Sequence, residues 1–143
     1  MNSTYDFTTG DLSTGSLTVV NVPVMLFPLD TGNEIVQFEF LLAIGSSNAA
    51  GLKVAIDVPA GTLFRAWAIG SGASRNALIV DPMTQSGVLG VAFNTFNGSQ
   101  NFLNIKGAVK TGTGAGNLQL QVAKVTNGTA TLHAGSYFTA QRL

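Results

Sequence analysis

A strict period of two runs through the stretch EIVQFEFLLAI at residues 34–44. Five large apolar side chains fall at its even positions, which share one face of an extended strand and would be scattered around a helix. The stretch is therefore predicted to be a β-strand with the core face Val36, Phe38, Phe40, Leu42 and Ile44. A register slip of one residue would expose all five side chains to solvent. This strand therefore determines which face of its sheet packs against the core.

Shorter apolar segments follow the same pattern on either side, and residues that favour turns separate them. Residues 34–44 and 52–58 flank the small-residue stretch GSSNAAG, which predicts a hairpin with one solvent-facing side. The segment 117–124 also alternates, and Gln119 is expected on its solvent face. The predicted strands, about nine in number, span residues 19–27, 34–44, 52–58, 63–69, 77–80, 87–93, 102–109, 117–124 and 136–142.

The connections between these segments contain no crossover helix, which parallel strands would need. We therefore expect an all-β fold, an antiparallel two-sheet jelly-roll sandwich with no substantial helix. A length of 143 residues suits one domain. We divide the chain into an N-terminal arm, residues 1–18, and a jelly-roll domain, residues 19–143.

The arm is mostly Ser, Thr, Gly, Asn and Asp, so it is too polar to fold alone. Its spaced apolar residues suggest a segment that grips a capsid or a neighbouring subunit through Tyr5, Phe7, Leu12 and Leu17. Two alternatives stay open: the segment is a frayed terminus, or its end is the first strand of the sandwich.

Charge is scarce and balanced, with seven basic and seven acidic residues and a formal net charge of zero. The chain has no electrostatic attraction for nucleic acid or an anionic membrane, and little repulsion between copies. Its longest apolar run, at residues 40–44, is far too short to cross a bilayer. The N-terminus lacks a basic, apolar leader. We therefore expect self-association, no nucleic-acid or membrane partner, and synthesis in a host cytoplasm.

No motif points to catalysis or to a bound cofactor. Cysteine is absent, and the single histidine, His133, has no partners at metal-ligand spacing. The acidic residues are scattered singly, and no G-x-S-x-G elbow is present, so we expect no enzyme and no catalytic, metal or cofactor site. One other feature stands out: Trp67 shares a strand face with Leu63, Arg65 and Ile69, opposite Phe64, Ala66 and Ala68. Both faces have mixed apolar character, which suggests that one of them meets another subunit.

The C-terminal third resembles a family of trimeric jelly-roll domains, similar to tumour necrosis factor, in virion proteins of tailed bacteriophages. The matching stretches are GNLQLQVA at 116–123 and AGSYFTAQRL at 134–143, with FEFLL at 38–42, GLKVAI at 51–56 and PAG at 59–61 upstream. The resemblance covers roughly residues 35–143. It implies a homotrimeric virion component, and no catalytic residue lies in the matching stretches.

We expect a homotrimeric capsid decoration, or cement, protein that sits on the capsid surface and contacts the major capsid protein. Family members often carry the domain at the end of a long fibre chain, whereas here it begins almost at Met1, which favours the decoration role. The alternative is a receptor- or glycan-binding tip of a head or tail fibre. A small glycan hydrolase is the third hypothesis, and the sequence offers least for it.

Overall fold

The computed structural model describes residues 3–7, 10–46, 52–71, 78–83, 91–93, 101–124 and 128–143. Every regular element in these residues is a β-strand. The strands are β1 (Ser3–Phe7), β2 (Leu12–Thr14), β3 (Val20–Leu29), β4 (Ile35–Ser46), β5 (Leu52–Asp57), β6 (Leu63–Ser71), β7 (Leu78–Met83), β8 (Val91–Phe93), β9 (Asn101–Lys110), β10 (Gly116–Lys124), β11 (Ala130–Leu132) and β12 (Tyr137–Arg142).

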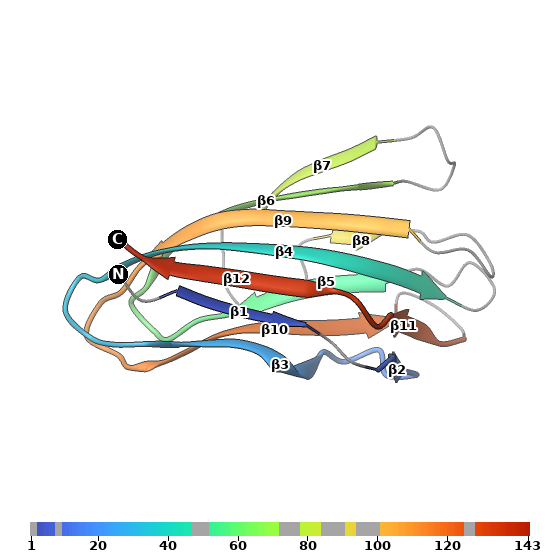
Figure 1. The fold of residues 1–143 in the computed structure, drawn as a ribbon, viewed down its shortest axis with the longest axis horizontal. Coiled ribbons are helices and arrows are strands. Elements are labelled where there is room, and N and C mark those ends of the chain that lie inside the picture. Colours follow the sequence, from blue (N-terminus) through green and yellow to red (C-terminus); the bar gives the residue numbers. More distant parts are fainter. Residues whose placement is uncertain are drawn as a thin grey trace.

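The strands form two antiparallel sheets that pack face to face (Figure 1). The larger sheet has the order β1-β12-β4-β9-β6-β7, with β11 pairing β2 and β4 beside it, and the smaller sheet has the order β3-β10-β5-β8. The predicted fold class is confirmed: the protein is an all-β, two-sheet sandwich. Every predicted segment overlaps a strand, and β1, β2 and β11 are strands that the sequence did not predict.

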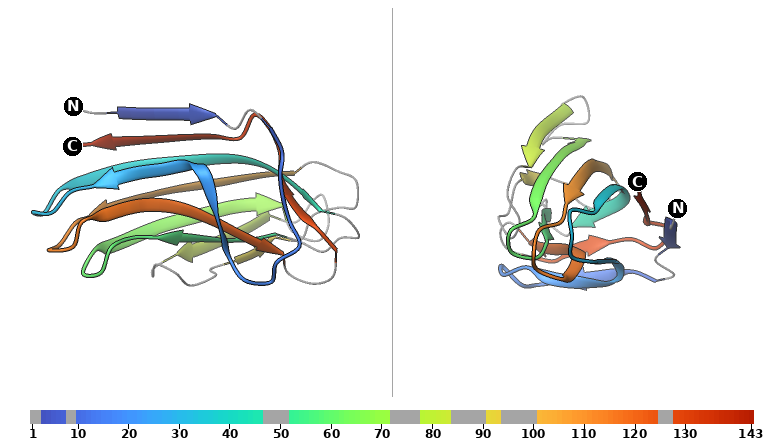
Figure 2. Two further views of the ribbon diagram at one scale, coloured as in Figure 1. Left: turned by 90° about the horizontal axis from the view of Figure 1, so that it is seen from below. Right: turned by 90° about the vertical axis from the view of Figure 1, so that its left-hand side faces the viewer.

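The path of the chain between the sheets is that of a jelly roll. The steps from β3 to β4, β4 to β5, β8 to β9 and β9 to β10 each change sheet, which interleaves β1-β12-β4-β9 with β3-β10-β5-β8. The extra pair β6 and β7 widens the larger sheet beyond β9 (Figure 2). The predicted hairpin of 34–44 with 52–58 is wrong, because β4 and β5 lie in different sheets.

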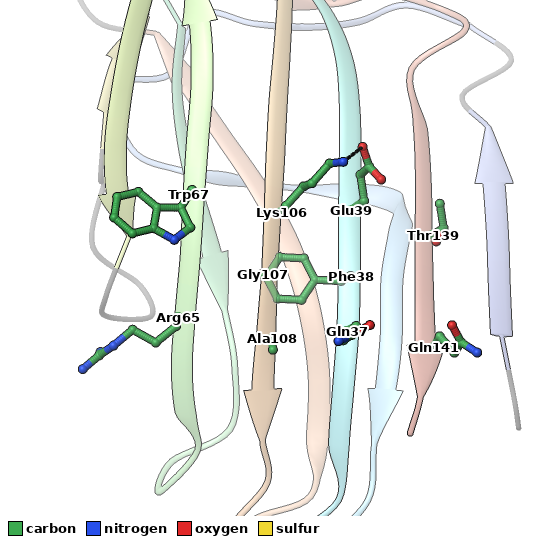
Figure 3. A pocket seen from close by; sticks show the side chains of 10 residues that line it. All are labelled: Gln37, Phe38, Glu39, Arg65, Trp67, Lys106, Gly107, Ala108, Thr139 and Gln141. Carbon is green, nitrogen blue, oxygen red and sulfur yellow. Dashed lines mark ion pairs between the residues drawn. The ribbon is translucent and has the colours of Figure 1, made fainter.

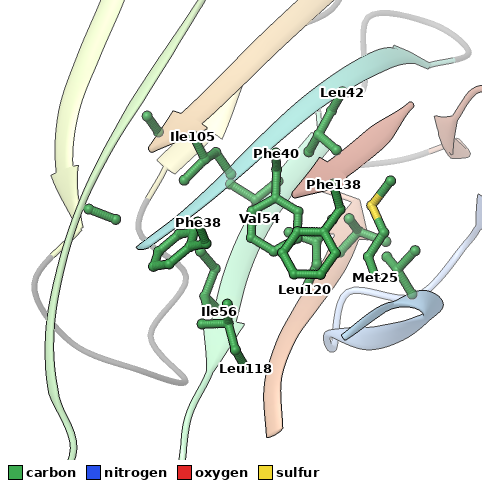
Figure 4. Close-up of a cluster of buried hydrophobic side chains, with 14 of the residues drawn as sticks. Met25, Phe38, Phe40, Leu42, Val54, Ile56, Ile105, Leu118, Leu120 and Phe138 are labelled. Carbon is green, nitrogen blue, oxygen red and sulfur yellow. The ribbon is translucent and has the colours of Figure 1, made fainter. Parts of the chain in front are cut away.

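The core lies between the two sheets and is built from their inward faces (Figure 4). All five residues of the proposed core face are buried, and Phe38 is the most exposed of them at 4%. The ring of Phe40 stacks on that of Phe138, and the ring of Phe38 stacks on that of Phe64. Burial of each large side chain contributes about 1.5–3 kcal/mol, so this face orients the larger sheet.

Gln119 is buried, so its expected place in solvent is wrong. Strand β3 bulges where it passes β10: Gln119 pairs with Leu26, whereas Gln121 pairs with Asn21. The Gln119 amide Nε2 donates hydrogen bonds to the carbonyls of Val22 at 2.8 Å and Met25 at 3.3 Å. The side chain therefore donates hydrogen bonds to backbone carbonyls that lack regular partners in the neighbouring strand because of the bulge.

The end of β12 is fastened to the connection between β3 and β4, which belong to different sheets. Arg142 Nη2 donates to the carbonyl of Pro28 at 2.8 Å, and Arg142 Nε pairs with the carboxylate of Glu34. The guanidinium also lies 4.6 Å from the centre of the Phe27 ring. These contacts tie the last strand to both layers of the sandwich.

Candidate functional site

The outer face of the larger sheet carries the most unusual surface among the described residues. Its side chains alternate with the core side chains along four strands and form rows across the sheet. We call this surface the outer face: Ile35, Gln37, Glu39, Leu41 and Ala43 of β4; Phe102, Asn104, Lys106, Ala108 and Lys110 of β9; Leu63, Arg65, Trp67 and Ile69 of β6; Tyr137, Thr139 and Gln141 of β12.

Several large apolar side chains on this face are open to solvent. The exposed fraction is 70% for Leu63, 65% for Phe102, 56% for Trp67, 43% for Ile35 and 41% for Ile69. Single exposed apolar residues are ordinary, but a group on one sheet face is typical of a surface that binds a partner.

Exposed apolar side chains lie at both ends of the face, with Leu63 and Ile35 at one end and Phe102 and Ile69 at the other. One row across the sheet contains Ile69, Asn104, Leu41 and Tyr137 in register, and Phe102 begins the next row. We call Phe102, Ile69, Leu41 and Tyr137 the apolar end. An exposed apolar surface of this kind suits contact with another protein subunit.

Beside the apolar end lies a recess of about 540 Å³ (Figure 3). Two register rows line it: Trp67, Lys106, Glu39 and Thr139 in the first, and Arg65, Ala108, Gln37 and Gln141 in the second. In the close-up, Trp67 and Arg65 lean from β6 toward β7, whereas Lys106 leans from β9 toward Glu39 on β4. The space between these side chains is the recess.

Small residues on β9 make the floor of the recess. Ala108 lies between Arg65 and Gln37 in its row and fills little of the space. The neighbouring position, Gly107, has no room for a side chain. A Cβ there would lie 2.4 Å from the carbonyl oxygen of Arg65 and 2.6 Å from Cζ of Phe38. The Phe38 ring thus lies against the sheet beneath the floor, and the recess is backed by the core.

Two polar groups of the recess, Lys106 and Glu39, are connected to each other and to Asn104 of the adjacent row. Lys106 Nζ lies 3.3 Å from Oε1 of Glu39, and Asn104 Nδ2 donates to the same oxygen at 2.7 Å. Because the Lys106 side chain is 64% exposed, this ion pair contributes little to stability. Its effect is to hold the Glu39 carboxylate at a fixed place beside the recess.

A second hollow of about 420 Å³ continues along the same strands. It shares Arg65 and Ala108 with the recess and extends to Ile35, Leu63 and Lys110. Arg65 therefore stands at the junction of two neighbouring depressions. Together they extend over the middle of the outer face and over the end that carries Leu63 and Ile35.

The proposed arm does not form a separate unit in the described residues. Strand β1, which contains Tyr5 and Phe7, pairs with β12 as the first strand of the jelly roll, and the side chains of these two residues lie outside the described part. Leu12 is half-buried against the core, and Leu17 is 60% exposed. Of the four anchors, Leu17 is thus the one seen to be open for a partner.

Asp11 fastens the N-terminal segment to the turn before β12. Its Oδ1 accepts a hydrogen bond from the backbone N–H of Ala134 at 2.8 Å, and its Oδ2 lies 3.3 Å from Nδ1 of His133. The N–H of Ala134 first, and then His133, lower the pKa of Asp11. His133 directly follows β11 and takes part in this contact.

No group of three or more His, Asp or Glu side chains in the described ranges could hold a metal ion. The same ranges contain no helix that is long and apolar enough to cross a membrane. The recess on the outer face presents aromatic, amide and charged side chains.

Comparisons with known proteins find no matching family model and no matching curated protein. Among solved structures, the chain is similar to one in infectious bursal disease virus, Gt strain, with a TM-score of 0.30 and 9% identity over 99% of this chain and 37% of that chain. For the Gx strain the TM-score is 0.22, with 13% identity over 99% of this chain and 41% of the other.

A third similar structure contains carbohydrate-binding modules of the β-sandwich superfamily, at a TM-score of 0.15 and 8% identity, covering 89% of this chain and 56% of that chain. This chain spans less than two thirds of each of these neighbours. Similarity at this level carries no argument about function, so the proposals below rest on this chain's own residues.

The sequence left open which face of residues 63–69 meets a partner, and it did not reveal the residues beside Trp67. Trp67, Lys106, Glu39 and Thr139 come from four strands, and only their register brings them into one row. The structure thus places an aromatic residue among polar groups on a sheet face.

Proposed function

We propose that this protein is a structural subunit of a bacteriophage particle, a homotrimer that decorates the capsid surface and stabilises the head. The observation that carries the proposal is the apolar end, where Phe102 and Ile69 are 65% and 41% exposed on one sheet face. Apolar surface removed from water contributes about 25 cal/mol per Å², so an association that covers this end is favourable. The resemblance to trimeric phage jelly-roll domains supports three copies.

Low charge supports the same proposal. The chain has a formal net charge of zero, so copies meet without long-range repulsion. A virion is built from many copies held at high local concentration, where even a moderate interface is occupied. The proposed contact with the major capsid protein uses the N-terminal segment, in which Leu17 is exposed.

Light scattering tests the self-association. We expect the wild-type protein to have three times the chain mass of 14.8 kDa, and the double variant Phe102→Ser, Ile69→Ser to have the mass of one chain. Leu17→Ser is the matched control, because Leu17 is as exposed as Phe102 but lies off the outer face. A wild-type mass of one chain at micromolar concentration would refute the trimer.

Capsid binding separates the decoration role from other roles. We expect the trimer to bind undecorated capsids, and Leu17→Ser to keep the trimer mass but weaken this binding. The copy number per particle gives a second measure, with hundreds for a decoration protein. A handful of copies would contradict decoration and favour a fibre or tail tip.

A further inference from the structure

We propose that the recess on the outer face is a binding site for a carbohydrate that carries a carboxylate. The site is separate from the apolar end and goes beyond the role of a structural subunit. It is lined by Trp67 and Arg65 of β6, Lys106 and Ala108 of β9, Gln37 and Glu39 of β4, and Thr139 and Gln141 of β12.

The size of the recess fits a ligand of one or a few sugar rings. Its volume of about 540 Å³ lies within the range of small-molecule sites. The floor at Ala108 is low and the core lies directly beneath it, so a ligand would rest on a rigid sheet surface. Such a site needs little rearrangement before it binds.

Trp67 supplies the surface on which a sugar ring can stack. The side chain is 56% exposed at the border of the recess, although a tryptophan with no partner would gain by burial. A pyranose ring has a face of C–H groups, which are weakly positive and pack on the negative face of an indole. An exposed tryptophan beside polar groups therefore fits a sugar better than a wholly apolar ligand.

The opposite side of the recess offers hydrogen bonds in both directions. The amide of Gln37 can donate and accept, and so can the hydroxyl of Thr139. A sugar presents a row of hydroxyl groups with the same double capacity. Because these side chains lie in two parallel register rows, adjacent hydroxyls can meet different strands.

Charge favours an acidic sugar over a neutral one. The lining contains two cationic side chains, Arg65 and Lys106, and one carboxylate, Glu39, which Lys106 and Asn104 already engage. Among the described contacts, Arg65 makes one hydrogen bond, from Nη1 to the carbonyl of Phe64 at 3.2 Å. The remaining N–H groups of its planar guanidinium, which form a rigid fork, can pair with a carboxylate through two parallel hydrogen bonds.

The test uses Trp67 itself, since it is the one tryptophan in the sequence and its fluorescence reports on the recess. The wild-type protein is titrated with oligogalacturonate and, separately, with neutral galacto-oligosaccharides and with acetate. We expect a saturable fluorescence change with oligogalacturonate, binding about tenfold or more weaker to the neutral sugar, and no saturation with acetate. No saturable binding of oligogalacturonate at millimolar concentration would overturn the proposal.

Variants measured by calorimetry locate the site. Arg65→Gln is expected to weaken oligogalacturonate binding about tenfold, Arg65→Lys nearly as much because lysine lacks the fork, and Trp67→Ala to abolish it. Lys53→Gln on β5 is the matched control, since it removes one positive charge from the other sheet. An equal loss in Arg65→Gln and Lys53→Gln, or unchanged binding in Trp67→Ala, would refute the site.

The assembly mass of each variant, measured by light scattering, distinguishes failure of the saccharide site from failure of the proposed trimer. Trp67→Ala and Arg65→Gln are expected to keep the wild-type mass and thermal midpoint while they lose the saccharide. The double variant at Phe102 and Ile69 is expected to lose the trimer and retain saccharide binding. If Trp67→Ala dissociates the assembly and the wild type binds no saccharide, the recess is part of the subunit contact and the proposal fails.

Discussion

The aromatic ring of Phe40 on β4 stacks on that of Phe138 on β12, with centroids 4.6 Å apart and planes inclined by 16°. The two residues are direct register partners in adjacent strands, and both are fully buried. A stacked pair of this kind adds about 0.5–1.5 kcal/mol to the burial of the two rings. The pair fixes the register between the best predicted strand and the last strand of the chain.

Replacement of Phe40 by alanine is expected to lower the free energy of unfolding by about 3–5 kcal/mol, because it removes a buried ring and leaves a cavity against Phe138. Urea denaturation measures the change. The control is Gln121→Ala, whose side chain makes one exposed hydrogen bond to Asn21. A shift in midpoint no larger than that of the control would mean that the core is misassigned.

Replacement of Gln119 by alanine tests the role of its buried amide. The change leaves the carbonyls of Val22 and Met25 without this donor, and each unpaired buried acceptor costs about 1–3 kcal/mol. Gln121→Ala, two residues along the same strand, is expected to cost less than about 1 kcal/mol. Equal denaturation midpoints for the two variants would contradict the structural role of Gln119.

A methyl group at Gly107 tests how closely β9 packs against its neighbours. Gly107→Ala would place a Cβ 2.4 Å from the carbonyl oxygen of Arg65, so we expect a loss of about 1–3 kcal/mol or more from overpacking. Gly15→Ala is the matched control, since a Cβ there meets nothing within 4 Å. Thermal unfolding of both variants measures the difference, and equal midpoints would count against the close approach.

The contact of Asp11 with Ala134 and His133 predicts a pH dependence. The folded protein lowers the pKa of Asp11, chiefly through the hydrogen bond from the Ala134 N–H. The contribution of this group to stability is therefore present above the pKa of Asp11 in the unfolded chain, and it is lost as the pH falls through the folded pKa. The contact should loosen in acid.

NMR titration of the Asp11 carboxyl carbon measures this pKa directly, with the urea-unfolded protein as reference. We expect a lower pKa in the folded protein, and His133→Ala to recover part of the shift while the Ala134 N–H maintains the rest. A folded pKa equal to or above that in urea would show that the contact does not form in solution.

The fold class and the core face could be predicted from the amino-acid sequence. Both follow from local alternation: the period of two at residues 34–44 orients five side chains whatever the neighbouring strands are. All five residues of that face are buried. The absence of helix in the described residues likewise follows from the same local pattern along the chain.

Which strands are neighbours could not be predicted from the sequence, because it depends on packing between distant segments. β4 and β5 appeared to form a hairpin, yet they lie in different sheets, because burying both apolar faces against each other gains more than pairing two adjacent strands. Gln119 is buried because β3 bulges over it, and a bulge in a distant strand leaves no mark in the alternation of β10. The recess has the same origin: Trp67, Lys106, Glu39 and Thr139 form one row through the register of four strands, which is set by packing across the whole sheet.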